Sequence, residues 1–212
     1  MSGNRRAATL PVSFFRQPSE VVARELLGTT IVSLLGGHRT VGRIVETEAY
    51  LGYRDPASHG YRHRRHAGNA ALFGPPGTWY VYRSYGIHWC ANLVCGVEGE
   101  GSAILLRAIE PLEGMDVMRT RRGPLSDRQL CSGPGKLCQA LGITKEEMDG
   151  VPMRGSRLTV LGERNAAPSA FAVTPRIGIT RAADWLLRFL LVQSPWVSRG
   201  LGRLGRPRVE AQ

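Results

Sequence analysis

The stretch Val-Gly-Arg-Ile-Val-Glu-Thr-Glu-Ala-Tyr-Leu, at residues 41 to 51, decides how this sequence folds. It is rich in β-branched residues and lacks proline, so it predicts a β-strand. The side chains of a strand alternate between the two faces of a sheet. One face should therefore carry Ile44, Glu46, Glu48 and Tyr50, and the other Val45, Thr47, Ala49 and Leu51.

Two carboxylates on one face of this strand have two explanations. In an open sheet, Glu46 and Glu48 simply face water and need no function. In a buried setting they repel each other, and at least one of them holds its proton more tightly. A buried pair costs stability and is typical of a functional site. The strand alone leaves both explanations open.

The sequence around this strand predicts one α+β domain. Pro18 suits the first turn of a helix and Gly28 suits its end, and the Gly36-Gly37 turn joins two strands as a hairpin. We predict strands at residues 29–35, 78–85, 87–95, 102–109, 157–161 and 171–179, helices at 112–121, 131–141 and 144–147, and either state at 182–192. The domain organisation we expect is a disordered basic arm at 1–11, a single domain at 12–200 and a flexible basic tail at 201–212.

The composition points to a polyanionic partner. The chain has 28 Lys and Arg residues against 17 Asp and Glu, a formal charge of +11. Such an excess is typical of proteins that bind nucleic acid or an anionic membrane surface. No apolar run is long enough to span a bilayer, and none follows Arg5 and Arg6 as a secretory signal would require. The four cysteines form no Cys-x-x-Cys pair, so we expect reduced, mostly buried thiols of a cytosolic protein.

Residues 52 to 78 predict a long loop of functional importance. It contains the cationic patch Tyr-Arg-His-Arg-Arg-His at residues 61 to 66. The histidines at 59, 63 and 66 suggest a metal site, but the interleaved arginines would repel a divalent cation and attract phosphate. We therefore predict phosphate contacts, and no metal, for this patch. The residues assigned to these contacts are Arg64 and Arg65.

The segment Trp-Tyr-Val-Tyr-Arg-Ser-Tyr-Gly at residues 79 to 86 is dense in aromatics. Such a mixture suits the stacking of single-stranded or everted bases. The alternative is an aromatic core, which we favour for Trp79 and Tyr80. Tyr85 differs because it stands beside Gly86 at the tip of a predicted hairpin, where there is no core to fill. A large aromatic at such a tip is suited to wedging between base steps.

Two further features suggest anion binding. Arg107 interrupts an apolar strand and therefore needs a carboxylate or an anion. Ser132, Gly133 and Lys136 stand at the start of a helix, where backbone N–H groups and a lysine make a phosphate site. A serine-capped helix of purely structural importance explains these three residues equally well.

Several segments of the chain form a recognisable series. They are Ala23-Arg-Glu-Leu-Leu-Gly28, Gly42-Arg-Ile-Val-Glu-Thr-Glu-Ala-Tyr-Leu-Gly52, Asp55-Pro-Ala-Ser-His59, Phe73-Gly-Pro-Pro-Gly77, Tyr80-Val-Tyr82, Tyr85-Gly86, Asn92, Leu105-Leu-Arg107-Ala, Cys131-Ser-Gly-Pro134, Lys136-Leu-Cys-Gln-Ala-Leu141 and Pro175-Arg-Ile-Gly178. In this order, from about residue 12 to 200, the chain resembles the alkyladenine (3-methyladenine) DNA glycosylase family.

The resemblance implies roles for individual residues. Glu48 falls on the general base that activates water to attack the sugar C1′ of an everted nucleotide, and Arg107 and the backbone carbonyl of Ile177 fall where that water is held. The pocket for the damaged base comprises Tyr50, His59, Tyr82 and Asn92, the last of which excludes normal guanine. Tyr85 falls on the residue that fills the gap left in the duplex.

The resemblance also implies a fold and an activity. The fold is a single α+β domain with a curved antiparallel sheet, surrounding helices and a protruding β-hairpin. The activity is hydrolysis of the N-glycosidic bond of alkylated or deaminated purines, such as 3-methyladenine, 7-methylguanine and hypoxanthine, without a cofactor. The partner is double-stranded DNA that contains damaged purines. The chain departs from the family's usual residues at Arg54, Ile87 and Trp89, which bear on substrate range.

Four expectations complete this interpretation. The only lysines, Lys136 and Lys145, have structural or phosphate-contact explanations, so we expect a monofunctional enzyme without lyase activity. We expect a monomer, in the cytoplasm of a bacterium or the nucleus of a eukaryote, and no membrane partner. One alternative is a non-catalytic nucleic-acid-binding module on the same fold. A second alternative is a metal-dependent nuclease that uses His59, His63, His66 and Glu48.

Overall fold

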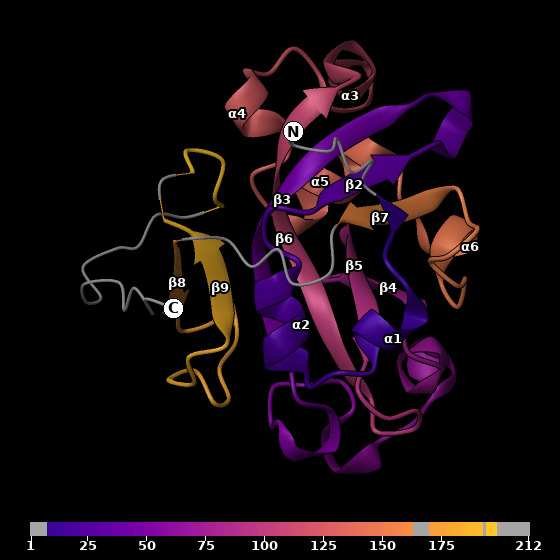
Figure 1. Ribbon diagram of the computed structural model, residues 1–212, viewed down its shortest axis with the longest axis vertical. Helices are drawn as coiled ribbons and strands as arrows, with labels where there is room; N and C mark the ends of the chain where they lie inside the picture. The colour runs from indigo at the N-terminus through magenta and orange to yellow at the C-terminus, as the bar shows by residue number, and fades with distance from the viewer. Residues whose placement is uncertain (1–7, 163–169, 193, 199–212) are drawn as a thin grey trace, which may run out of the picture.

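A single antiparallel sheet forms the centre of the molecule (Figure 1). The computed structural model describes residues 8–162, 170–192 and 194–198. Within these residues the strand order is β1-β7-β2-β3-β6-β5-β4, and β9 pairs with both β3 and β8. The strands are β1 (Ala8–Thr9), β2 (Thr30–Ser33), β3 (Thr40–Tyr50), β4 (Trp79–Ser84), β5 (His88–Cys95), β6 (Ser102–Glu113), β7 (Leu158–Gly162), β8 (Phe171–Thr174) and β9 (Arg188–Leu191).

The strand predicted at residues 41 to 51 is β3, and it organises the sheet. Its first half pairs with β2, its whole length pairs with β6, and its segment from Glu46 to Glu48 also pairs with β9. The register with β6 shifts between Ile44 and Glu46 and again between Glu46 and Thr47. Such bulges bend a strand and re-aim its side chains. We therefore expect β3 to bend next to the two glutamates.

The helices and short turns surround this sheet. The α-helices are α1 (Val12–Phe15), α2 (Ser19–Glu25), α3 (Met115–Arg122), α4 (Asp127–Leu130), α5 (Pro134–Leu141) and α6 (Lys145–Met148), and the 3-10 helices are η1 (Leu35–Gly37), η2 (Gly52–Arg54), η3 (Tyr61–His63) and η4 (Ala67–Phe73). Helix α2 packs on β3, where the Thr47 hydroxyl donates a hydrogen bond of 2.8 Å to the Ala23 carbonyl. Figure 1 shows α3 and α4 beyond one end of β3 and β6, and the loops that follow β3 beyond the other end.

The predicted α+β class and the curved antiparallel sheet are confirmed. Among the described residues, no helix is long and apolar enough to cross a membrane. The ambiguous segment at residues 182–192 ends in a strand, β9. The four cysteines are buried and free, as expected.

Three boundaries were predicted wrongly. Residues 8–11 are not part of a disordered arm, because Ala8 and Thr9 pair with β7. Strand β6 runs to Glu113, into the segment predicted as helix, and β8 stops at Thr174, short of the predicted strand end. The rest of the predicted arm (1–7) and the predicted tail (201–212) lie outside the described residues.

Candidate active site

Alternation along four neighbouring strands gathers one set of side chains on a single face of the sheet. In the register of the sheet, Glu48 lies opposite Leu105, Leu105 opposite Asn92, and Asn92 opposite Tyr80. Residues two positions away on each strand share this face: Tyr50, Ala103, Arg107, Cys90 and Tyr82. Apart from Glu48, all of these residues line a cavity of about 470 Å³. The chain therefore brings its predicted base pocket together as one surface.

Glu48 lies beneath this cavity and is completely buried. Its Oε2 accepts a hydrogen bond of 3.0 Å from the Tyr50 hydroxyl, and its Oε1 accepts one of 2.8 Å from the backbone N–H of Ile177. The Arg107 Nη1 lies 3.3 Å from the same Oε1. Each of these three partners lines the cavity. The carboxylate is thus held just behind the cavity surface, which removes the alternative in which it faces bulk water.

Glu46 is also completely buried but has stronger partners. Its Oε1 accepts hydrogen bonds from Arg107 Nε at 2.9 Å and from Arg188 Nε at 2.7 Å. Ser198 adds its backbone N–H at 2.6 Å and its hydroxyl at 2.8 Å. The prediction that Arg107 needs a carboxylate or an anion is confirmed, since Arg107 contacts both glutamates.

The two glutamates consequently differ in acidity. Burial raises the pKa of Glu48 above its ordinary value, and Arg107 and the Ile177 N–H only partly offset this. Burial also acts on Glu46, but Arg188, Arg107 and the Ser198 N–H outweigh it and lower its pKa. Groups whose environments push their pKa values apart are typical of acid–base chemistry.

A buried ion pair behind Tyr50 was not predicted from the sequence. The Arg176 guanidinium lies 4.6 Å from the centre of the Tyr50 ring and pairs with Asp55, and both charged side chains are fully buried. Arg176 also donates to the Ala49 carbonyl at 3.1 Å, and Asp55 accepts the backbone N–H of Leu51 at 3.2 Å. The pair ties the end of β3 to the segment that carries Ile177. Asp55 and Arg176 both stand in segments that carry the family resemblance, so a signal was present.

The side wall of the cavity is aromatic. The His59 and Tyr82 rings meet edge to face with centroids 4.5 Å apart, and the His59 Nδ1 lies 2.8 Å from the Tyr80 hydroxyl. Burial lowers the pKa of His59, which favours the neutral form of its imidazole. Asn92 donates both of its side-chain N–H groups, to the Tyr80 and Cys90 carbonyls at 3.0 and 3.4 Å. The group that Asn92 offers to the cavity is therefore its side-chain carbonyl. Tyr80, predicted as core, is buried but lines the cavity.

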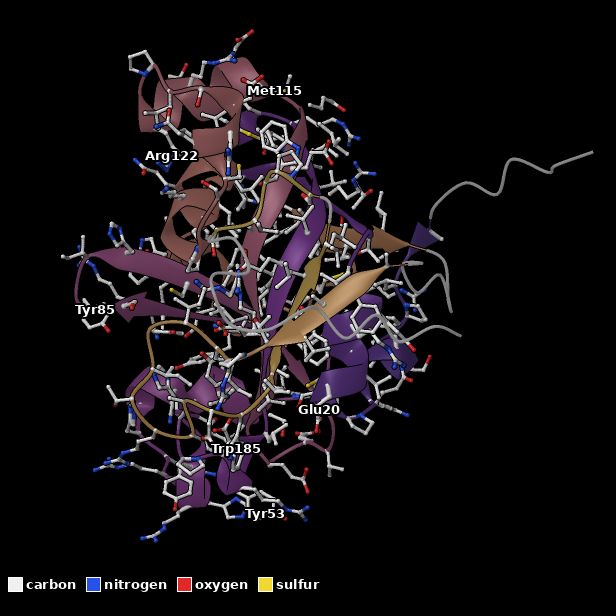
Figure 2. The ribbon with its side chains drawn as sticks, turned by 90° about the vertical axis from the view of Figure 1, so that its left-hand side faces the viewer. Glu20, Tyr53, Tyr85, Met115, Arg122 and Trp185 are labelled. Atoms are coloured by element: carbon white, nitrogen blue, oxygen red, sulfur yellow. The ribbon has the colours of Figure 1, made fainter. Side chains whose placement is uncertain are left out.

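Tyr85 lies at the tip of the β4–β5 hairpin, as predicted. The residue is 85% exposed, and Figure 2 shows it at the end of the hairpin, away from the body of the molecule. Tyr85 and Gly86 have φ values of 50° and 67°, and the Ile87 N–H donates to the Ser84 carbonyl at 3.0 Å. Positive φ at both central residues is the signature of a type I′ turn, and it is uncommon for a bulky side chain. A strained residue that is also exposed favours a functional explanation over a structural one.

The predicted phosphate contacts are only partly brought together. Ser132, Gly133 and Lys136 stand at the start of α5. This end of the helix lies beside the hairpin, as the close approach of Gly135 to His88 shows: a Cβ on Gly135 would lie only 2.7 Å from the His88 Cβ. Arg65 instead reaches the Gly99 carbonyl at 3.1 Å and covers the Phe73 ring. It therefore points toward the turn at the other end of β5 from Tyr85.

A second cavity of about 520 Å³ shares His59, Tyr80 and Tyr82 with the first. Its cationic lining residues are Arg64, Arg83, Lys145 and Arg181, and it has no carboxylate in its lining. Only Arg64 among these was assigned to phosphate from the sequence. The others come from three separate parts of the chain, which no local pattern connects.

The histidines of the nuclease alternative do not gather around Glu48. The His63 ring stacks on Tyr53 with centroids 4.5 Å apart, and the His66 Nδ1 accepts the Gly68 N–H at 3.1 Å. In the part of the chain that the structure describes, no three His, Cys, Asp or Glu side chains are grouped closely enough to hold a metal ion.

Comparison with known proteins gives this site a family. The sequence profile described as methylpurine-DNA glycosylase (MPG) matches residues 13–195. The chain belongs to the methylpurine-DNA glycosylase family. It is therefore a DNA glycosylase, of a family that acts in the repair of alkylation damage.

Close relatives support the same assignment, and each is named as a 3-methyladenine DNA glycosylase. One from Agrobacterium fabrum is 50% identical over 190 residues, which covers 90% of this chain and 92% of the relative. One from Methanoculleus marisnigri is 48% identical over 198 residues, which covers 90% of this chain and 99% of the relative. One from Rhodopseudomonas palustris is 48% identical over 190 residues, which covers 90% of this chain and 88% of the relative. The similarity thus extends over nearly the whole of this methylpurine-DNA glycosylase.

We predict that the buried Asp55–Arg176 pair stabilises this methylpurine-DNA glycosylase strongly. Asp55→Asn leaves a buried guanidinium without its counter-charge, which should lower the free energy of unfolding by roughly 3–5 kcal/mol. The matched control is Glu113→Gln, which breaks a half-exposed pair with Arg39 and should cost less than about 1 kcal/mol. Urea unfolding measures both, and equal losses would contradict the prediction.

Proposed function

We propose that this glycosylase hydrolyses the N-glycosidic bond of alkylated or deaminated purines everted from duplex DNA, and leaves an abasic site. The substrates we propose are 3-methyladenine, 7-methylguanine and hypoxanthine. The observation that carries this proposal is Glu48, a completely buried carboxylate whose partners form the floor of an aromatic cavity.

The cavity is suited to a cationic purine. The rings of Tyr50, Tyr82 and His59 provide flat aromatic surfaces, and an electron-poor ring is attracted to such surfaces. The lowered pKa of His59 favours its neutral form, which adds no positive charge to repel an alkylated base. A cationic base is also a good leaving group, since it departs as a neutral molecule. We assign discrimination among bases to the Asn92 carbonyl, which is left to the cavity because the side-chain N–H groups are engaged elsewhere.

Glu48 is the residue we assign as general base. It accepts a proton from water while the water oxygen bonds to the sugar C1′, and the electron pair of the N-glycosidic bond leaves with the base. A pKa raised toward the working pH makes a carboxylate more effective in this role. We assign Arg107, whose Nη1 lies 3.3 Å from Glu48 Oε1, to hold this water. The corresponding role of the Ile177 carbonyl stays a prediction, because the contact of Ile177 with Glu48 is through its N–H.

The positions of the two lysines are consistent with hydrolysis without lyase activity. Lys145 is ion-paired with Asp149 at 3.0 Å and donates to the Gly68 carbonyl at 3.2 Å. Lys136 is exposed at the start of α5, outside the residues that line either cavity next to His59. Neither lysine is placed beside Glu48 to form a Schiff base with C1′.

DNA is held, in this proposal, by groups around the cavity mouth. Tyr85 fills the gap left by the everted nucleotide, and the start of α5 and the cations of the second cavity contact phosphates on the strand. We further propose that the protein acts on DNA as a monomer, in the cytoplasm of a bacterium or the nucleus of a eukaryote. A non-catalytic binding module would gain nothing from a buried carboxylate with a raised pKa.

We expect Glu48→Gln to abolish release of free base from methylated duplex DNA, with a loss of at least about a hundredfold in the single-turnover rate. Binding to the same duplex should persist, since the side chain keeps its shape. Glu110→Gln, which changes a partly buried carboxylate on β6 that pairs with Arg43, is the control and should release base at the wild-type rate. Equal release by wild type and Glu48→Gln would show that the assigned base is wrong.

Tyr85→Ala should slow excision from duplex DNA far more than excision from single strands. The wedge acts only where a gap must be filled, and eversion from a duplex costs a few kcal/mol. Tyr53→Ala, a change of the same kind remote from the hairpin, is the control. A loss of the same size on duplex and single-stranded substrates would exclude the wedge role.

A further inference from the structure

We propose that Glu46 is a positioning residue for this reaction. Together with Arg188 and Ser198, it holds the Arg107 guanidinium and limits the contact of Arg107 with Glu48. The segment at residues 194–198 thereby completes the active site. This inference rests on the proposed role of Glu48 as general base.

Arg107 lies between two carboxylates and is bound unequally by them. Its Nε donates to Glu46 Oε1 at 2.9 Å, whereas its Nη1 lies 3.3 Å from Glu48 Oε1. The guanidinium is planar and holds its donors in a fixed fork. An Arg107 anchored through Nε to Glu46 therefore cannot turn both of its terminal nitrogens onto Glu48. Glu46 fixes where Arg107 stands relative to the catalytic carboxylate.

Glu46 is in turn fixed from two distant parts of the chain. Arg188 on β9 lies opposite Glu48 in the register of the sheet, and its Nε donates to Glu46. The Ser198 hydroxyl donates to Glu46 at 2.8 Å and accepts from Arg107 Nη2 at 3.4 Å. Ser198 thus touches both members of the Glu46–Arg107 pair. A residue 152 positions away from Glu46 in the chain completes the set.

Among the residues that the structure describes, the charges of this network are balanced. Two carboxylates, Glu46 and Glu48, face two guanidiniums, Arg107 and Arg188, and all four are buried. If Arg107 paired with Glu48 alone, it would hold that carboxylate in its charged form and make it a weaker base. The groups that act on Glu48 are Tyr50 and Glu46 from β3, Arg107 from β6 and the Ile177 N–H, with Cys90 on β5 and Arg176 behind Tyr50 as neighbours. Glu46 is the one that both repels Glu48 and anchors its cationic partner.

The test compares wild type with the double variant Glu46→Gln/Arg188→Gln. This variant removes one charge of each sign, so Arg107 and Glu48 remain a neutral pair and no buried charge is left alone. The Glu48 carboxyl is followed by carbon-13 NMR titration of labelled protein, assigned by its absence in Glu48→Gln. Single-turnover excision of 7-methylguanine from duplex DNA is measured across the same pH range.

We expect the pKa of Glu48 to fall by about one unit or more in the double variant. The pH at which the excision rate rises should fall by the same amount. The rate at its plateau should fall roughly tenfold, because the base is weaker, while the Kd for DNA should stay within about twofold of wild type. A role confined to stability would lower the melting temperature and leave the titration in place.

One control and one second test variant keep the outcome interpretable. Arg43→Gln/Glu110→Gln removes an ion pair that joins the same two strands at an exposed position, and it should leave both measurements unchanged. Ser198→Ala removes one hydrogen bond from Glu46 without altering charge and should shift the titration in the same direction by a smaller amount. If the double variant fails to fold, the titration of Glu48 in Ser198→Ala tests the inference in its place.

An unchanged titration of Glu48 in a folded variant would overturn the inference. The NMR measurement needs no catalysis, so it separates the two proposals. A shifted titration in a protein whose wild type releases no base would refute the proposed function, and only the effect of Glu46 on the Glu48 carboxylate would stand. Base release with no shift would refute the positioning role alone.

Discussion

Two carboxylates buried two residues apart on one strand set the constraint on which the rest of this structure depends. Neither can stay charged without cations and aligned donors, because an uncompensated buried charge costs several kcal/mol. The chain supplies them from β6, from β9, from the backbone at Ile177 and from Ser198. Satisfying Glu46 and Glu48 therefore brings together segments that lie more than 140 residues apart.

The division of these partners gives the site its chemistry. Glu46 takes most of the hydrogen bonds and becomes the more acidic carboxylate, while Glu48 is left with fewer partners beneath an aromatic cavity. A protein selected for stability alone would have no use for this difference in acidity between Glu46 and Glu48. Natural proteins accept such costs at functional sites. The aromatic wall of the cavity and the strained tip of the hairpin are further features of this kind, and both suit a large, flat ligand.

Local patterns predicted much of this arrangement. Alternation placed Glu46, Glu48 and Tyr50 on one face, Gly86 marked the hairpin tip, and the isolated Arg107 needed a carboxylate or an anion. Ile44 was predicted on the same face as the glutamates, but the register shift between Ile44 and Glu46 puts it in the core with Ala49. The sequence could not predict contacts between distant segments, such as Asp55 with Arg176 or Glu46 with Ser198, because no local period encodes them. Arg188 lay in a segment whose pattern fitted either helix or strand. Arg65 was assigned from charge, which says nothing of direction, and it points toward the Gly99 turn.

The most direct test is a crystal structure of the Glu48→Gln variant bound to a duplex with a single hypoxanthine. We predict that the purine is everted into the cavity between Tyr50 and the His59–Tyr82 wall, with the sugar C1′ facing position 48 and Tyr85 in the vacated gap. A hypoxanthine that remains stacked in the duplex, or one whose C1′ faces away from position 48, would contradict the central claim.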